Sequence, residues 1–245
     1  MRCVIPLSSG YFFTKESHLA ADPTDASEQF HLAEMYHFGE GVPQDFTEAV
    51  KWYRLAAAQG YANAQFAFGY SLTTGRGVAG DKAEAVKWYR LAAAQGNAEA
   101  QHSLGFAYYK GEGVAENKTE AVKWYRLAAA QGDAKAQNNL GTMYYDGEGV
   151  PQDFPEAVKW YRLAADQGLA IAQGALGDAY SNGEGVPEDF LQAYKWLNLA
   201  AAALEDTTFV RYAVEGKNRV ARNMTKEQIA EAQRLSTAFK PTKTP

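Results

Sequence analysis

The sequence predicts an all-α solenoid, on three observations. The segment EAVKWYRLAAAQG begins at Glu48 and returns unchanged at Glu84 and at Glu120. A fourth copy, at Glu156, differs only by Asp166 in place of an alanine. The interval is 36 residues each time, which indicates an array of units that stack on their neighbours. The segment itself has the apolar spacing and the start and stop signals of a helix.

The repeated segment is predicted to be the second helix of each unit. Its apolar residues recur at three- and four-residue spacings and give a broad apolar face, whereas Lys51 and Arg54 fall on the opposite face. The apolar positions of the first copy are Ala49, Val50, Trp52, Tyr53, Leu55, Ala56 and Ala57. We predict that the repeated tryptophans are core residues, whose truncation to alanine would cost about 3–5 kcal/mol. These are Trp52, Trp88, Trp124, Trp160 and Trp196.

Both ends of this helix carry signals. Asp45 precedes it and Glu48 follows three residues later, which is typical of a capping box worth about 1 kcal/mol. The pair recurs as Asp81/Glu84, Asn117/Glu120, Asp153/Glu156 and Asp189/Gln192. These carboxylates therefore have a structural role. Glycine in the left-handed conformation is expected to end the helix. The glycines concerned are Gly60, Gly96, Gly132 and Gly168.

Each unit is predicted to begin with a first helix and a tight loop. In the third unit Leu104 and Tyr108 share a helix face, and Gly105 allows a neighbouring helix to approach closely. A GEGV or GRGV loop follows at 39–42, 75–78, 111–114, 147–150 and 183–186. Its two glycines permit positive φ in a tight turn, and its valine is expected to pack back into the core.

These signals divide the chain into four parts. Residues 1–24 are expected to be a partly disordered leader, and five units of 36 residues follow at 25–60, 61–96, 97–132, 133–168 and 169–204. At 205–240 we expect a helical cap that covers the end of the array, because Leu204 stands where the next glycine should be. Its helices are predicted at 207–222 and 226–239, the second capped by Thr225 and Gln228, with a disordered tail at 241–245.

Composition limits the functional classes. A hydrophobic content of 47% and a charged content of 22% are ordinary for a soluble domain, and a net charge of −5 gives no reason to expect a nucleic-acid partner. Cys3 is the only cysteine, which excludes an intramolecular disulfide and a thiolate metal cluster. No apolar run is long enough for membrane insertion, and the N-terminus makes a poor signal peptide. We expect a cytoplasmic protein, or a periplasmic or secreted one if the true start lies upstream.

The repeat pattern is A-x-x-x-L-G-x-x-Y-x-x-G-x-G-V-x-x-D-x-x-x-A-x-x-W-Y-x-x-A-A-x-Q-G, and it resembles the Sel1-like repeat, a relative of the tetratricopeptide repeat. The resemblance covers 25–204, and residues 224–233 resemble the ending of many bacterial Sel1-like proteins. Departures are Ala33, Leu72 and Leu197 in place of a glycine and two tyrosines. The resemblance implies a right-handed α/α solenoid that serves as an adaptor or scaffold, and it identifies no partner.

Comparing the five units shows which first-helix positions vary. Three of them lie at i, i+4 and i+7, on one face, which is expected to be concave in a tetratricopeptide-like stack. We call them the stripe: Phe30, Glu34, His37; Phe66, Tyr70, Thr73; His102, Phe106, Tyr109; Asn138, Thr142, Tyr145; Gly174, Asp178, Ser181. We predict that the stripe binds a peptide or protein segment; the alternative is packing between adjacent first helices. The predicted binding residues are Phe66, Tyr70, Phe106, Tyr109 and Tyr145, together with Glu34, His37 and His102.

No catalytic or metal-binding motif stands out. His31 and His37 are six residues apart, which does not give the i, i+4 pair of a zinc site, and Asp146 begins a glycine turn that lacks the ligands of a calcium loop. There is no phosphate-binding loop and no nucleophile elbow. We therefore expect no cofactor and no catalysis. Two alternatives remain: a hydrolase of the cysteine-rich, β-lactamase-like Sel1-like group, although these repeats lack its cysteine pairs, or an assembly subunit that uses the basic C-terminal cap.

Overall fold

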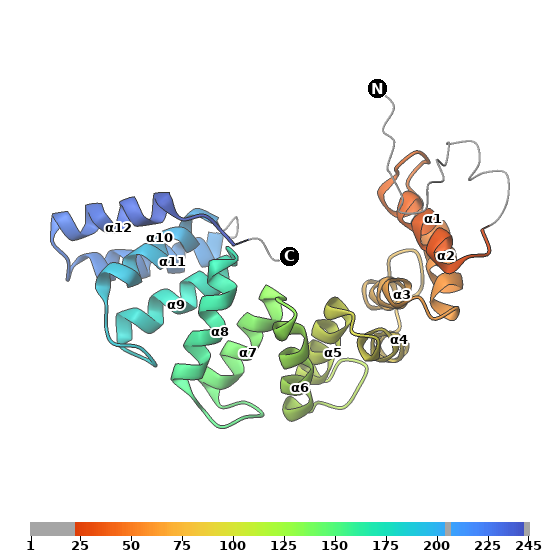
Figure 1. Cartoon of the computed structure of the whole chain (residues 1–245), viewed down its shortest axis with the longest axis horizontal. Helices are drawn as coiled ribbons and strands as arrows, with labels where there is room; N and C mark the ends of the chain where they lie inside the picture. Colours follow the sequence, from red (N-terminus) through yellow and green to blue (C-terminus); the bar gives the residue numbers. More distant parts are fainter. Residues whose placement is uncertain (1–22, 204–206, 243–245) are drawn as a thin grey trace. The chain divides into compact units, whose positions relative to one another are not determined.

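The computed structural model describes residues 23–203 and 207–242, which form twelve α-helices and no strands (Figure 1). The predicted all-α fold is confirmed. The helices of the five repeats are α1 (Ala26–Phe38), α2 (Phe46–Ala58), α3 (Ala62–Thr74), α4 (Lys82–Ala94), α5 (Ala98–Lys110), α6 (Lys118–Ala130), α7 (Ala134–Asp146), α8 (Phe154–Asp166), α9 (Ala170–Asn182) and α10 (Phe190–Ala203). Two further helices, α11 (Thr207–Ala221) and α12 (Lys226–Ala238), follow them.

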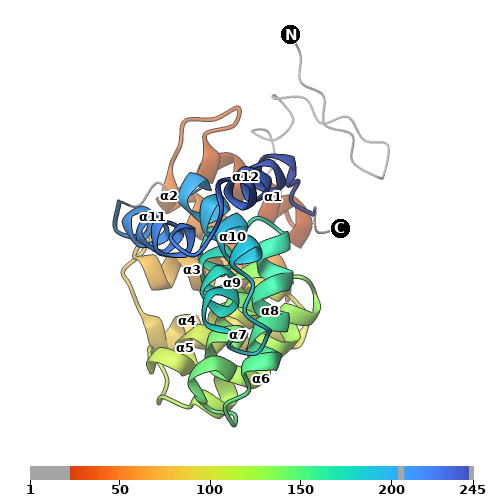
Figure 2. The ribbon, with the colours of Figure 1, turned by 90° about the vertical axis from the view of Figure 1, so that its left-hand side faces the viewer.

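The helices group into two compact units, Met1–Ala100 and Gln101–Pro245. In the first unit, α1 packs on α2, α2 on α3, and α3 on α4. In the second unit, α6 packs on α7, α7 on α8, α8 on α9, and α9 on α10 (Figure 2). Within each unit, therefore, the second helix of one repeat packs on the first helix of the next, as a solenoid requires.

The predicted helix starts are confirmed, with one difference. The Asp45 side chain accepts hydrogen bonds from the backbone N–H groups of Thr47 and Glu48 at 2.9 and 3.1 Å. Asp81, Asn117, Asp153 and Asp189 each accept the equivalent bond from the residue three positions later. The glutamates, however, do not reach back to the helix start but form ion pairs with lysines three residues later. These pairs are Glu48–Lys51, Glu120–Lys123 and Glu156–Lys159. A reciprocal capping box is present at Thr225 and Gln228, at the start of α12.

The core aromatic residue of the second helix is the tyrosine, not the tryptophan. Tyr125 is 1% exposed, and the equivalent tyrosines 53, 89 and 161 are also buried. Trp196 is buried as predicted, but the prediction is wrong for Trp52, Trp88, Trp124 and Trp160, which are half-buried. The tyrosine faces the first helix of its own repeat, where glycine makes room: a Cβ on Gly105 would lie 2.8 Å from Cδ1 of Tyr125. The predicted close approach at Gly105 is thus confirmed.

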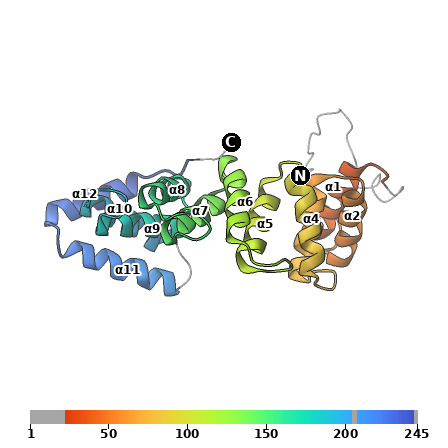
Figure 3. The same cartoon turned by 90° about the horizontal axis from the view of Figure 1, so that it is seen from below.

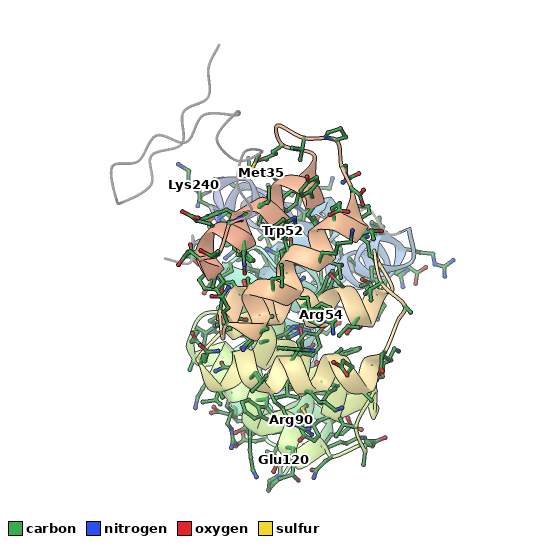
Figure 4. All side chains as sticks on the ribbon, turned by 90° about the vertical axis from the view of Figure 1, so that its right-hand side faces the viewer. Met35, Trp52, Arg54, Arg90, Glu120 and Lys240 are labelled. Atoms are coloured by element: carbon green, nitrogen blue, oxygen red, sulfur yellow. The ribbon has the colours of Figure 1, made fainter. Side chains whose placement is uncertain are left out.

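The apolar face of the second helix is narrower than predicted. Leu55, Leu91, Leu127 and Leu163 occupy the same position in four repeats, and each is about half exposed. Lys51 and Arg54 on α2 are exposed, as predicted, and so is Arg90 on α4, at the position equivalent to Arg54. Figure 4 labels the two arginines. The tryptophan and the leucine three residues later therefore border the solvent.

Within each unit, the glycine loops hold a repeat against the one before it. Both glycines of the loop have positive φ, at 69° for Gly75 and 75° for Gly77, as predicted. The second glycine also lies against backbone, because a Cβ on Gly77 would be 2.1 Å from the carbonyl oxygen of Phe46. The same contact joins Gly185 to Phe154, at 2.3 Å. A side chain at either glycine would push adjacent repeats apart.

A pair of glutamines also joins neighbouring repeats, and the sequence pattern did not predict it. Gln65 is buried on α3, and its Oε1 accepts a hydrogen bond from Nε2 of Gln95 at 2.8 Å. The same Nε2 lies 3.0 Å from the carbonyl oxygen of Gly60, at the end of the previous repeat. Gln137 and Gln167 form the equivalent pair. These amides satisfy carbonyl groups that a helix end leaves without partners.

The two C-terminal helices cover α10. Helix α11 packs on α10 and meets α9, and α12 packs on α10 (Figure 3). Val220 and Ala232 complete an apolar cluster with Ala193, Tyr194 and Leu197 of α10. The predicted cap helices are present in the described part of the chain, whereas Leu204 and residues 1–22 of the predicted leader lie outside it. Of the predicted disordered tail, 243–245 also lie outside, but Thr242 is held by a 2.8 Å hydrogen bond to the carbonyl oxygen of Asp166.

Candidate protein-interaction site

In the first repeat the stripe is largely engaged in packing. The Phe30 ring lies 5.8 Å from the ring of Tyr53, and the Tyr53 hydroxyl donates a hydrogen bond to Glu34. Burial and this bond raise the pKa of Tyr53. The His37 ring lies edge-on to Phe46 at 5.2 Å. Two predicted binding residues, Glu34 and His37, are thus half-buried partners of their own repeat.

The second repeat exposes a tyrosine on its stripe. Tyr70 is 47% exposed, and its ring lies 6.2 Å from the half-buried ring of Phe66. Phe66 in turn lies 6.0 Å from Tyr89 in the core, and the hydroxyls of Thr73 and Tyr89 are 2.9 Å apart. Within the first unit, then, Tyr70 is the predicted aromatic residue that is accessible, and Phe66 supports it.

The third repeat presents Phe106, which is 41% exposed. The preceding stripe residue, His102, packs 5.7 Å from Tyr125, and its Nε2 lies 3.3 Å from Nδ2 of Asn139. Burial lowers the pKa of His102, which favours the neutral ring. His102 therefore supports the site from inside the repeat.

A small pocket lies beside Phe106. Its volume is about 100 Å³, and it is lined by Phe106, Tyr109, Tyr125, Asn139, Thr142 and Met143. Helices α5 and α7 supply its walls, and α6 supplies Tyr125, whose pKa burial raises. Pockets that enclose a drug-sized ligand are about 300–1,000 Å³. A pocket of this size instead suits one apolar side chain.

Glutamates of the glycine loops lie beside two stripe tyrosines, Tyr145 and Tyr109. The Tyr145 hydroxyl donates a 2.8 Å hydrogen bond to Oε2 of Glu184, and its ring lies edge-on to Phe154 at 5.1 Å. Tyr109 lies near Glu148, and burial together with that carboxylate raises the pKa of Tyr109. Lys118 is hydrogen bonded to Glu148 and holds the pKa of that glutamate below its usual value, and its Nζ lies 5.7 Å from the centre of the Tyr109 ring. The Tyr145 ring is therefore oriented by a direct hydrogen bond, whereas the Tyr109 ring lies beside an ion pair.

The stripe is covered at the fifth repeat. Gly174 is buried, and Asp178 accepts a 2.6 Å hydrogen bond from the hydroxyl of Tyr212 on α11. Arg219 of the same helix lies 3.5 Å from Asp178. Burial and the bond to Asp178 raise the pKa of Tyr212 to about 12, and burial raises the pKa of Asp178. The polar end of the stripe is thus filled by the chain itself.

The structure separates the predicted residues into groups. Phe106 and Tyr109 share the pocket, Phe66 and Tyr70 are neighbours on α3, and Tyr145 lies on α7 beside a loop glutamate. Sequence reasoning missed the pocket floor, because Tyr125 is the same in four repeats and a search for variable positions passes over it. Met143 follows the stripe residue Thr142 directly, so its position on the first helix was a usable signal.

No other chemistry gathers in the part of the chain that the structure describes. Within residues 23–203 and 207–242, no three His, Cys, Asp or Glu side chains come together as metal ligands would. Across those same ranges, every helix is too short or too polar to span a bilayer.

Known proteins share this architecture. The Sel1 repeat family matches at 29–61, 62–97, 98–133, 134–169 and 170–203. A Sel1 repeat protein from Oxalobacter formigenes is 32% identical, covers 94% of this chain and 91% of its own length, and has a TM-score of 0.78. A Klebsiella pneumoniae protein, described as a possible Sel1 repeat protein, is 20% identical over 84% of this chain and 98% of its own, with a TM-score of 0.51, and shares the fold alone.

A third solved structure is longer than this chain. The protein c5321, a protective antigen of uropathogenic Escherichia coli with an SLR fold, is 34% identical over 88% of this chain, with a TM-score of 0.59. The match spans 53% of c5321, about half its length. No curated protein matches the sequence. The five consecutive matches, which cover most of the residues from 29 to 203, establish that the chain belongs to the Sel1 repeat family.

Proposed function

We propose that this protein is a non-catalytic scaffold whose stripe binds a peptide or protein segment and receives one apolar side chain in the pocket beside Phe106. Sel1 repeat solenoids generally serve protein interaction. The observation that carries the proposal is the pocket itself, in which an exposed aromatic residue borders a cavity the size of a side chain. Aromatic anchors of this kind are worth about 2 kcal/mol or more in interfaces.

The pocket combines apolar walls with a few polar groups. Phe106 and Met143 supply apolar surface, while Asn139 and Thr142 place an amide and a hydroxyl at the same cavity. A peptide could therefore bury a side chain and still satisfy a backbone group.

The proposal is tested by selecting peptides from a random display library on the wild-type protein and measuring their affinity for variants. Phe106→Ala/Tyr109→Ala should weaken binding at least about tenfold, because it removes one wall and the rim of the pocket. The matched control is Leu127→Ala, an exposed apolar residue on α6 outside the stripe, which should leave the affinity unchanged. Equal affinity for wild type and the double variant would reject the stripe as the site.

Two measurements address the alternatives. Turnover of a chromogenic β-lactam by the pure protein would overturn the non-catalytic proposal and favour a hydrolase. If substitutions at 211–226 abolished partner binding while the double variant retained it, the basic cap would be the interface instead.

A further inference from the structure

The outer edge of the repeats differs between the fourth repeat and the fifth. The tryptophan of each second helix and the leucine three residues after it form what we call the outer ridge. In the fourth repeat, Trp160 is half-buried and Leu163 is 48% exposed. In the fifth, Trp196 is 4% exposed and Leu199 is half-buried. The outer ridge is therefore covered at the fifth repeat and exposed at the fourth.

The cover is the extended segment that follows α12. Phe239 has φ −65° and ψ 132°, and its ring lies edge-on to Trp196 at 5.5 Å. Pro241 lies over Gly168, with its Cγ 3.2 Å from the position that a Cβ would take there. The N–H of Thr242 then donates to the carbonyl oxygen of Asp166 at 2.8 Å. An aromatic ring, a proline and one backbone N–H thus make three successive contacts.

The parts that receive this segment recur in other repeats. They are a second-helix tryptophan, the glycine that ends the preceding second helix, and a carbonyl in the last turn before that glycine. In the first unit they are Trp88, Gly60 and the carbonyl of Ala58, and in the second unit Trp160, Gly132 and the carbonyl of Ala130. Carbonyl groups in the last turn of a helix lack an intrahelical partner.

Both recurring sites have open surface. Nothing lies within 4 Å of the position a Cβ would take at Gly60, and Leu91 beside Trp88 is 50% exposed. In the second unit, Leu163 beside Trp160 is 48% exposed. The contact at Asp166 uses its backbone carbonyl, which the alanines of the other repeats also supply.

We propose that the outer ridge at Trp88 and at Trp160 binds an extended segment of a partner protein that carries an aromatic residue two positions before a proline. The ring packs on the tryptophan and leucine, the proline covers the helix-ending glycine, and the next N–H meets the last-turn carbonyl. A proline-containing extended segment loses little conformational entropy on binding. The ridge belongs to the second helices and the stripe to the first, so neither proposal depends on the other.

The test uses an acetylated and amidated peptide with the sequence of residues 237–242, TAFKPT, added to the full-length protein. The five tryptophans give five indole N–H signals in a proton–nitrogen NMR spectrum, which single Trp→Phe variants assign. The signals of Trp88 and Trp160 should shift saturably, while that of Trp196 stays in place because its own segment covers it. A peptide with alanine for phenylalanine should bind at least about tenfold more weakly.

Variants of the protein supply the matched controls. Leu91→Glu should remove the shift at Trp88 alone, and Leu163→Glu the shift at Trp160 alone, since both leucines are exposed and their replacement should leave the fold intact. Tyr70→Ala, on the stripe, should leave both shifts unchanged. The proposal is overturned if the peptide shifts neither Trp88 nor Trp160, if only Trp196 responds, or if the glutamate variants bind as wild type does.

Discussion

The stripe is open in the third repeat and closed in the fifth. Phe106 stands exposed beside its pocket, whereas the equivalent Asp178 is covered by Tyr212 and Arg219 of α11. The fifth repeat is followed by α11, which packs on α10 and meets α9, so that Tyr212 reaches Asp178, whereas the third repeat is followed by another repeat. The cap thus covers the polar end of the stripe, and Phe106 in the third repeat stays exposed.

The largest expected loss of stability is at the floor of the pocket, where Tyr125 lies. Tyr125→Ala should lower the free energy of unfolding by about 3–5 kcal/mol, because it removes a buried aromatic ring from the core. Trp124→Ala, at the neighbouring half-buried position, should cost clearly less. Urea denaturation of both variants measures the difference, and an equal loss for both would contradict the assignment of tyrosine as the core residue.

A smaller loss of stability is expected at Gly105, where Tyr125 of the pocket floor packs against the first helix. Gly105→Ala places a Cβ 2.8 Å from the Tyr125 ring and should cost about 1–3 kcal/mol by overpacking. Gly174→Ala is the matched control, because Gly174 also lies within a first helix without positive φ, and a Cβ there would meet nothing closer than Ala200 at 4.0 Å. Thermal melts should show a loss of stability for Gly105→Ala and little change for Gly174→Ala. Peptide affinity should fall for Gly105→Ala alone, because it disturbs the pocket.

The stability contributed by Asp178, at the covered end of the stripe, should depend on pH. Burial raises the pKa of Asp178 above 3.8, so the folded state binds its proton more tightly than the unfolded state does. The contribution of this group to stability therefore falls as pH rises from 3.8 through the raised pKa. Asp178→Asn can still accept the bond from Tyr212 but does not titrate, so its melting temperature relative to wild type should increase across this window. A constant difference between the two proteins would refute the assignment.

The smallest expected effect on stability is at Phe106, where the stripe is exposed. Phe106→Ala should change the free energy of unfolding by less than about 1 kcal/mol, because the ring is 41% exposed. Tyr70→Ala should behave alike on α3. A calorimetric scan that shows a loss comparable to that of Tyr125→Ala would place Phe106 in the core and remove it from the site.

Periodicity and cap residues predicted the helices well, since both are local properties of the chain. Periodicity could not rank Trp124 against Tyr125: adjacent residues on one broad apolar face differ in burial only through what packs against them. The tyrosine packs against the first helix of its own repeat, at a small residue that is glycine in repeats two to four and Ala33 in the first. Leu55 falls on the predicted apolar face for the same reason and is half exposed.

The candidate site was predicted in part. Variation among repeats selected Phe106 and Tyr109, which line the pocket, and also His37 and Glu34, whose contacts are with their own repeat. The glutamine pairs were overlooked because Gln65 and Gln95 look like ordinary surface residues in the sequence. Contacts between repeats are invisible to a pattern that is read within one repeat.

The most direct test of the stripe is an NMR spectrum of the methionine methyl groups. The chain has four methionines, of which Met143 lines the pocket, while Met35 and Met224 lie elsewhere, on α1 and just before α12. On adding a peptide selected for binding, the Met143 methyl signal should shift, and the Met35 and Met224 signals should remain in place. A peptide that binds while the Met143 signal stays unchanged would contradict the account.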